Sequence, residues 1–287
     1  MKRILLGTII LMIFITNYSL LGQEVKWNGK IDEDKTIGKV DSMIVTKYLA
    51  KFRDSIVVKR EPREKKYKVL FDKKGVITNK TYIGYSDQLS DSYEYTYNKD
   101  GGITKEVSKN SNGENRFIIE LTYDNNHKMI EEKHWSILGN NDKWIIKNNE
   151  IENTAIRYFT KGEGDFTSSS GTKYYFNKND LIEKVEDDNY VWIYKYDDRN
   201  NLIFRFMDEK MQAINLDDNS KSNHISSIEM NYDSNSNIIR YIDKSRGKVN
   251  KDKFFTYEYD NLGNWIKKIE YWKDEPIYIF EREIFYK

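Results

Sequence analysis

The sequence predicts an all-β fold in which consecutive antiparallel β-hairpin repeats form a coiled or solenoid-like sheet. Three observations support this prediction. The chain holds 22 tyrosines and 13 phenylalanines but only two prolines, its aromatic residues alternate along stretches of strand length, and one turn pattern recurs. Aromatic and β-branched side chains suit a half-buried pleated surface. A recurring unit implies that each hairpin buries its apolar face against its neighbours.

The clearest copy of the unit runs from Phe254 to Trp272. Alternate side chains of a strand lie on the same face, so three rings share one face here: Phe255, Tyr257 and Tyr259. Asp260 and Gly263 then form a D-x-x-G turn. Asp favours the first position of a type I turn, and Gly accepts the positive φ of the fourth. The return strand begins at Trp265.

The same template finds six further turns. They are Phe71-Asp72-x-x-Gly75, Tyr97-Asn98-x-x-Gly101, Tyr123-Asp124-x-x-His127, Phe176-Asn177, Tyr196-Asp197-x-x-Asn200 and Tyr232-Asp233-x-x-Ser236. In six of the seven copies an apolar residue follows the ring at the sixth position: Ile77, Ile103, Met129, Leu202, Ile238 and Trp265. This fixed spacing predicts one loop geometry for all copies. The long step from Tyr123 to Phe176 leaves room for a degenerate unit around Trp144 to Ile156.

The Y-x-Y-D-x-x-G-N core at Tyr257 to Asn264 resembles the tyrosine–aspartate (YD) repeat of the Rhs family. The resemblance covers roughly residues 66–287 and implies a β-strand spiral, which in large family members closes into a shell around a toxin domain. Seven or eight units are too few for such a shell, and no toxin domain follows them. The resemblance therefore implies the fold rather than a function. The short, loose array is similar to exported proteins of the Bacteroidetes.

The N-terminus, Met1 to Gly22, reads as a secretory signal peptide, with Lys2 and Arg3 ahead of an apolar run and small Gly22 at the expected cleavage point. The alternative is a membrane anchor, but the apolar run Ile4–Ile15 is short of the roughly 20 residues that cross a bilayer. The chain has no cysteine, which excludes a lipoprotein anchor, disulfides and thiolate metal sites. We expect a periplasmic, cell-surface or secreted protein without a membrane span after cleavage.

Residues 23–65 are predicted to be an extended or capping segment ahead of the repeat domain at residues 66–287. Within it, Val40 to Phe52 fits two structures. Ile44, Tyr48 and Phe52 are spaced as a helical stripe, yet the segment also alternates as a strand would. We favour a short helix or a capping segment that covers the open end of the array. Ser55 to Lys59 is expected to be a first strand, and Pro62 a break after it, because proline cannot donate to a ladder.

Charge and residue types restrict the function. Lys and Arg number 47 against 46 acidic residues, and the signs are interspersed, so nothing favours nucleic acid or an anionic membrane. His127 occupies a turn position, His134 has no second ligand at metal spacing, and His224 lies in a polar loop. Asp233 to Asn237 resembles the start of a calcium loop but lacks its acidic twelfth residue. We therefore predict no catalytic residue, no metal and no cofactor.

The candidate ligand-binding residues are aromatic. Trp192, Trp265 and Trp272 would stack on sugar rings if exposed, whereas the alternative is that they pack against neighbouring strands. The sequence favours an exported, non-catalytic binding or structural scaffold with an unknown protein or glycan partner. The alternatives are a carbohydrate-binding or carbohydrate-active protein and an immunity-type partner of a secreted toxin.

Overall fold

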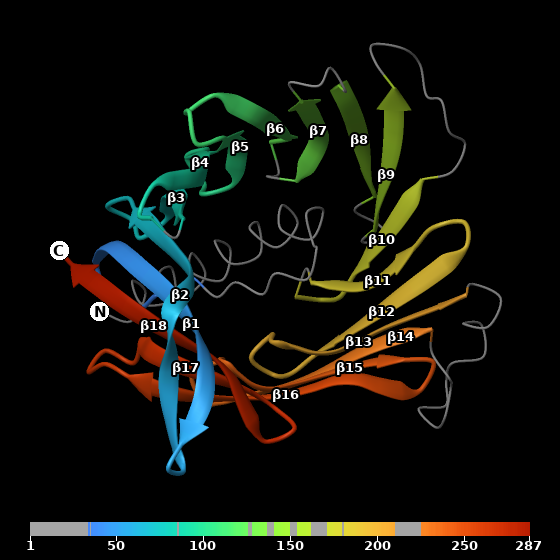
Figure 1. Ribbon diagram of the computed structural model, residues 1–287. Helices are drawn as coiled ribbons and strands as arrows, with labels where there is room; N and C mark the ends of the chain where they lie inside the picture. The colour runs from blue at the N-terminus through green and yellow to red at the C-terminus, as the bar shows by residue number, and fades with distance from the viewer. Residues whose placement is uncertain are drawn as a thin grey trace, which may run out of the picture.

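The computed structural model describes residues 34, 36–84, 86–125, 128–136, 141–149, 154–161, 171–179, 181–209 and 225–287. The predicted signal peptide, His127 and His224 lie outside them. Regular structure in these residues is entirely β-strand (Figure 1). The strands are β1 (Val40–Arg53), β2 (Ile56–Phe71), β3 (Ile77–Ile83), β4 (Leu89–Tyr97), β5 (Ile103–Lys109), β6 (Asn115–Tyr123), β7 (Met129–Ser136), β8 (Asn141–Asn149), β9 (Thr154–Lys161), β10 (Thr172–Phe176), β11 (Ile182–Glu186), β12 (Tyr190–Tyr196), β13 (Leu202–Glu209), β14 (Ser226–Tyr232), β15 (Ile238–Ser245), β16 (Lys248–Tyr259), β17 (Trp265–Trp272) and β18 (Glu275–Tyr286).

The strands form one antiparallel meander in which each pairs with its neighbours in sequence. In addition, β1 pairs with β18 as well as with β2, so that Val45 lies opposite Tyr67 on one side and Arg282 on the other. The ladder of pairings thus returns to its first strand. The predicted all-β hairpin array is confirmed. A solenoid-like array would instead leave two end strands with unpaired N–H and C=O groups, and the β1–β18 pairing satisfies them.

The predicted helix at Val40 to Phe52 is wrong, because this segment is strand β1. Its 14 residues are flanked by β2 and β18, and main-chain hydrogen bonds on both sides outweigh a helical stripe of three residues. The predicted break at Pro62 is wrong as well, because strand β2 runs unbroken from Ile56 to Phe71. Pro62 lies where the β1–β2 register shifts between Lys47 and Leu49, so its missing N–H removes no ladder bond. The degenerate unit around Trp144 is the hairpin of β8 and β9.

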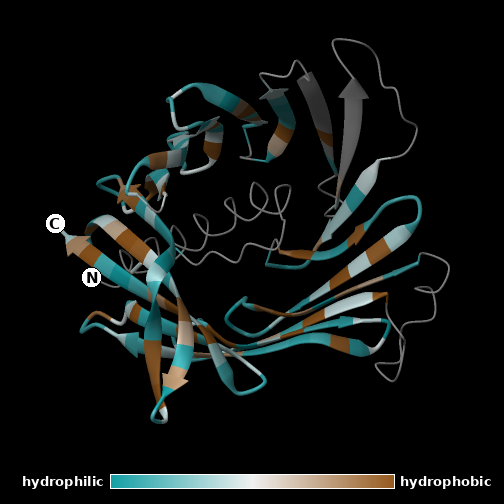
Figure 2. Ribbon diagram, in the orientation of Figure 1, coloured by the Kyte–Doolittle hydropathy of each residue, from teal (hydrophilic) through white to brown (hydrophobic). Residues whose placement is uncertain are grey.

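The strands share a more buried face, here called the core face. Its fully buried side chains include Met43, Val45 and Val69, which pack with Phe71 and Trp265 in one of three apolar clusters. Hydrophobic and hydrophilic residues are interspersed along the strands (Figure 2).

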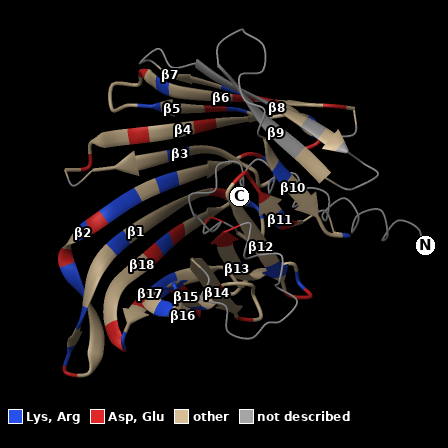
Figure 3. Cartoon of the chain, turned by 90° about the vertical axis from the view of Figure 1, so that its right-hand side faces the viewer, with Lys and Arg blue, Asp and Glu red and all other residues tan. Residues whose placement is uncertain are grey.

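The opposite face carries cross-strand ion pairs between neighbouring strands. These are Lys109–Glu94 at 2.6 Å, Lys267–Glu258 at 2.7 Å and Arg240–Asp252 at 2.9 Å. Basic and acidic residues are accordingly interspersed over the strands (Figure 3). The near-zero net charge of the chain is therefore accompanied by local pairing of opposite charges between neighbouring strands.

Tyrosine hydroxyls tie consecutive hairpins together at the rim that carries the D-x-x-G turns. The ring residue of one unit donates to the main-chain carbonyl at the sixth position of the preceding unit. These ties are Tyr97 to Ile77 at 2.5 Å, Tyr123 to Ile103 at 2.8 Å, Tyr196 to Ile182 at 2.7 Å and Tyr232 to Leu202 at 2.8 Å. In the degenerate unit the Asn148 amide makes the equivalent bond to Met129, at 3.2 Å. Each tie joins two strands that no turn connects at this rim.

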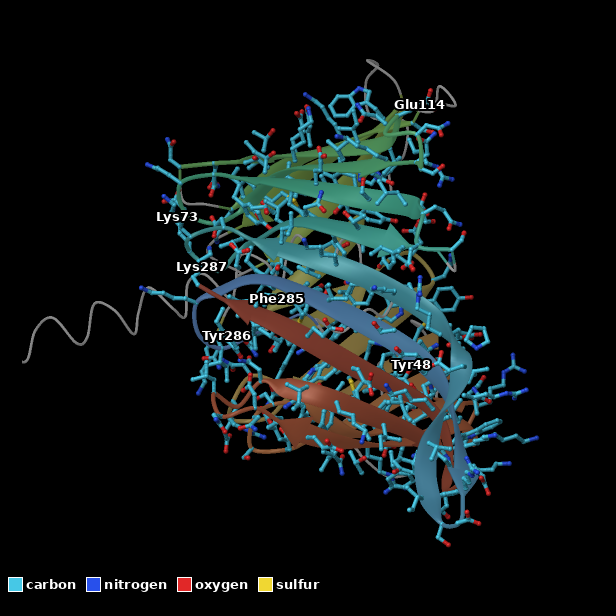
Figure 4. All side chains as sticks on the ribbon, turned by 60° about the vertical axis from the view of Figure 1, so that its left-hand side comes forward. Tyr48, Lys73, Glu114, Phe285, Tyr286 and Lys287 are labelled. Carbon is cyan, nitrogen blue, oxygen red and sulfur yellow. The ribbon has the colours of Figure 1, made fainter. Side chains whose placement is uncertain are left out.

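The last two units use a second form of tie. Tyr257 donates to the Ile238 carbonyl at 2.8 Å, while the Tyr259 hydroxyl reaches the turn carboxylate Asp233. One unit later, Tyr286 bonds Asp260 in the same way. Tyr286 and Lys287 lie at the rim that holds Lys73, and Glu114 lies at the opposite rim (Figure 4). Tyr286 is thus the ring residue of a half-unit that ends the array.

Asn264 joins this last unit to the segment that leads into β1. Its amide donates to the Ile37 carbonyl at 2.8 Å and to the Tyr286 hydroxyl at 2.7 Å, and its carbonyl oxygen accepts from the Ile37 N–H. The side chain is 3% exposed. Beside it the Lys287 N–H donates to the Lys39 carbonyl at 2.8 Å, so both ends of the described chain are fixed to each other at this rim.

We expect Asn264→Ala to lower the free energy of unfolding by about 2–3 kcal/mol, because it removes a buried side chain that bonds both the N–H and the C=O of Ile37 and the Tyr286 hydroxyl. Asn237→Ala is the matched control. Asn237 holds the same position in the preceding unit. Its amide donates to the Tyr259 hydroxyl at 3.1 Å but does not bond the segment that leads into β1, so its loss should cost about 1 kcal/mol. Urea unfolding of both variants measures the difference, and equal losses would contradict the role given to Asn264.

Tyr123→Phe tests a tie and its pH dependence. Burial, with a smaller contribution from Glu132, raises the pKa of Tyr123 to about 12. The unfolded tyrosine ionises near pH 10, so the folded state loses stability as the pH rises from about 10 to 12. The variant should lose about 1 kcal/mol at neutral pH and show a shallower decline above pH 10. Tyr190→Phe is the control, since its ring is 36% exposed. If Tyr123→Phe were as stable as the wild-type chain both at neutral pH and above pH 10, the tie would be ruled out.

Candidate functional site

The predicted turn residues lie at one rim and share one geometry. The first-position side chain accepts hydrogen bonds from the main-chain N–H groups two and four residues on, as Asp72 does from Lys74 at 2.7 Å and Val76 at 2.9 Å. The corresponding acceptors in the other copies are Asn98, Asp124, Asn177, Asp197, Asp233 and Asp260. Positive φ angles occur at the fourth position: Gly75, Gly101, Asn200, Ser236 and Gly263. Phe71, Phe176 and Tyr259 end the strands before their turns.

The turn carboxylates accept hydrogen bonds within their own hairpins. Burial alone would raise the pKa of Asp260, but hydrogen bonds from the Tyr286 hydroxyl and from the N–H groups of Asn264 and Leu262 outweigh it and lower that pKa. Asp233, first residue of the calcium-like sequence, accepts from the N–H groups of Asn235 and Asn237 in the same way. In the part of the chain that the structure describes, no group of three acidic or histidine side chains is placed to hold a metal.

The three candidate tryptophans lie in different environments. Trp265 is 6% exposed and belongs to the apolar cluster of β1 and β2. Trp192 is half-buried and contacts Tyr190 with ring centroids 6.0 Å apart. Trp272 is 44% exposed at the end of β17, with the Lys273 ammonium 5.2 Å from its ring centroid. The structure does not bring the three rings together as one stacking platform.

A cation–aromatic cluster surrounds Trp265 on the core face. The Arg282 guanidinium lies 3.4 Å from the Trp265 ring centroid, and the Lys268 ammonium lies 4.2 Å from that of Phe280. Both cations are nearly fully buried, at 5% and 3% exposure. Ring faces carry negative potential and stabilise cations that have left water. The sequence carries a signal for this cluster, since Arg282 shares strand parity with Tyr278 and Phe280.

A buried carboxylate and a histidine meet on β7. Glu132 is fully buried and its carboxylate contacts the His134 imidazole. The Phe117 ring stands edge-on to His134 with centroids 5.2 Å apart. Both residues point to the core face because they are two apart in one strand. Sequence spacing alone did not single out this pair, because Glu132 is one of many carboxylates in alternating strands.

A cavity of about 300 Å³ opens where β2 leaves β3. Its lining includes Arg63, Lys65, Tyr82, Ser90, Asp91 and Tyr93. The two rings meet edge to face at 6.0 Å, and the Lys65 ammonium lies 4.3 Å from the Tyr82 centroid. Arg63 is held by the Gly84 carbonyl and the Asp87 carboxylate, each at 2.7 Å. A cavity of this size and lining suits a small polar molecule with a flat face.

Comparison with known proteins gives structural similarities at low sequence identity. No protein family matches the chain, and no curated protein matches it in sequence. A porin-like protein from Bacteroides uniformis has 10% identity and a TM-score of 0.41, over 87% of this chain and 98% of that one. TcdB2-TccC3-TEV has 10% identity and a TM-score of 0.29, over 79% of this chain and 15% of that one. A DUF1329 family protein from Desulfovibrio piger has 9% identity and a TM-score of 0.25, over 96% and 93%.

At TM-scores below 0.5 these similarities do not place the chain in any of those folds. The part of the chain that the structure describes contains no helix with the length and apolarity that a bilayer crossing requires.

The tryptophan environments give a spectroscopic test. Trp272→Phe should lower the fraction of the total fluorescence that iodide quenches, because a charged quencher reaches exposed rings and this ring is 44% exposed. Trp265→Phe is the matched variant and should leave the quenchable fraction unchanged, since its ring is 6% exposed. Stern–Volmer plots of the two variants provide the measurement. Loss of quenching in Trp265→Phe would contradict the burial described above.

Proposed function

We propose that this chain is an exported, non-catalytic binding scaffold that works in the cell envelope or outside the cell. The observation that carries the proposal is the contrast between a tied frame and one projecting hairpin. Strand pairing runs from β1 to β18 and back to β1, and tyrosine ties brace the turn rim. The end of the β1–β2 hairpin leaves this frame and exposes apolar side chains such as Ile56, which is 67% exposed. A rigid support with an exposed element suits binding.

The chemistry of the core face supports a non-catalytic role. Lys268 and Arg282 are stacked on rings, and Glu270 lies 2.6 Å from the Lys253 ammonium. A catalytic acid or base must reach a substrate atom, whereas these groups are packed within the sheet. The signal-peptide-like N-terminus supports the proposed export and an address in or beyond the envelope.

The test is an affinity experiment with the mature chain, residues 23–287, immobilised against a detergent-free envelope extract. The scaffold proposal expects a saturable protein partner that is retained at physiological salt. A parallel incubation with cell-wall and host polysaccharides monitors new reducing ends. Turnover that scales with the protein concentration would overturn the proposal, as would the absence of any saturable partner.

The cavity beside β3 favours a second candidate function, carbohydrate binding. Tyr82 and Tyr93 offer aromatic faces, and Lys65 and Ser90 offer polar contacts, which is the combination that sugar rings need. Under this candidate, Tyr93→Ala should abolish retention on a polysaccharide column, and Trp272→Ala, a ring outside the cavity, should not. Retention that survives Tyr93→Ala would exclude the cavity as the sugar site.

A further inference from the structure

The end of the β1–β2 hairpin is paired only with itself. On one side, β18 pairs with β1 as far as Leu49, opposite Tyr278. On the other, β3 pairs with β2 from Lys66 onward, opposite Ile83. Residues 50–65, here called the arm, therefore project beyond both neighbouring strands, as Figures 1 and 4 show at the bottom of each view. Both long edges of the arm lack a strand partner among the described residues.

The turn at the tip of the arm decides which main-chain groups point outward. Asp54 and Ser55 have φ angles of 50° and 65°, the signature of a two-residue type I′ turn. Such a turn is closed by a hydrogen-bonded pair, which is Arg53 with Ile56. Because hydrogen-bonded and non-bonded pairs alternate, the N–H and C=O groups of Val57 and Lys59 point away from β1.

Only a short part of the β2 edge of the arm is accessible. Pro62 has no N–H to offer, and the Arg63 side chain is bound to Gly84 and Asp87. These residues close the base of the arm. The open edge is therefore Ile56–Arg60, three β-branched residues followed by two cations, a composition that favours an added strand.

The side chains of the arm specify the charge of what binds there. Phe52 is 45% exposed and Ile56 is 67% exposed. Around them stand four cations, Lys51, Arg53, Lys59 and Arg60, and the whole arm holds six cations against three carboxylates, Asp54, Glu61 and Glu64. Lys59 is already paired with Glu281 at 2.6 Å, and Lys51, Arg53 and Arg60 are exposed. The arm is thus locally basic in a chain that is nearly neutral.

We infer that the arm binds an extended acidic segment of a partner protein, which adds a strand to the Ile56–Arg60 edge. This inference rests on the scaffold function proposed above. Main-chain bonds to Val57 and Lys59 would supply affinity, and acidic side chains of the added strand would face Arg53 and Arg60 and supply specificity. Two arms would bring like charges together, which disfavours self-pairing.

The probe is a fluorescein-labelled heptapeptide of alternating valine and glutamate, measured by anisotropy against the full mature chain. We expect saturable binding that weakens as salt is raised, and no binding of the valine–lysine counterpart. Hydrogen exchange should slow at the amides of Val57 and Lys59 on binding, while those of Ile56 and Val58 stay as they were, because they already bond β1. Equal binding of both peptides would overturn the inference.

Val57→Pro removes one outward N–H without touching the ladder inside the arm, and it should weaken peptide binding about tenfold. Val57→Thr keeps that N–H and is the matched control. Because a proline can also disturb the arm, a second variant is needed. Arg53→Glu combined with Arg60→Glu should reverse the preference to the lysine peptide. Wild-type binding by Val57→Pro, or an unreversed preference in the charge variant, would contradict strand addition.

Two controls separate the competing occupants. Sedimentation of the wild-type chain alone tests arm-to-arm pairing, and flotation with phosphatidylglycerol vesicles tests a lipid surface. A dimer that Val57→Pro abolishes, or vesicle binding in the absence of peptide binding, would overturn the inference. Should Val57→Pro capture the same envelope partner as the wild-type chain, the scaffold function stands and the arm is not its binding site.

Discussion

The hydrogen bond from a tyrosine hydroxyl to the main chain of the preceding hairpin is the interaction on which this architecture depends. In a meander of hairpins, a turn joins the two strands of each hairpin at the turn rim. Neighbouring strands of consecutive hairpins have no turn between them at this rim, so without the tyrosine bond only main-chain pairing would hold them together. Tyr97 and Tyr123 each place a hydroxyl on the carbonyl that begins the previous return strand. Because this bond is local to neighbouring units, it can be repeated along the array without any long-range adjustment.

The same constraint explains why ring and turn residues stand together in the sequence. The ring must end its strand at the rim, and the next residue must start the turn, so Tyr196 and Asp197 are adjacent for a geometric reason. The Asp197 carboxylate accepts hydrogen bonds from two main-chain N–H groups of its own turn, and these bonds fix the start of the return strand β13. The ring residue of the next unit, Tyr232, then donates to the first carbonyl of that strand, Leu202. The turn therefore positions the carbonyl that the tyrosine of the next unit binds.

Charge in this protein is used mainly within the sheet. On the core face, cations lie on ring faces, as Arg282 does on Trp265; on the opposite face, they pair with carboxylates across strands, as Arg240 does with Asp252. The arm differs from both, since Lys51, Arg53 and Arg60 are exposed and lie beside apolar residues that are exposed as well. This difference distinguishes the paired sheet, which supports the structure, from the arm, which is exposed for binding.

The sequence by itself determined the local features, because they depend on neighbours within a few residues. Alternating rings require strands, and Asp260 with Gly263 requires a tight turn, so the all-β hairpin array could be predicted. Only the tertiary structure decided that Val40–Arg53 is a strand, because its pairing with β18 joins residues more than 200 positions apart. Burial of Trp265 and exposure of Trp272 were equally undecided, since strand parity fixes the face of a ring but not what packs on that face. The site residues divide in the same way: the turn acceptors were visible in the spacing, whereas the contact of Glu132 with His134 and the isolation of the arm follow from strand register.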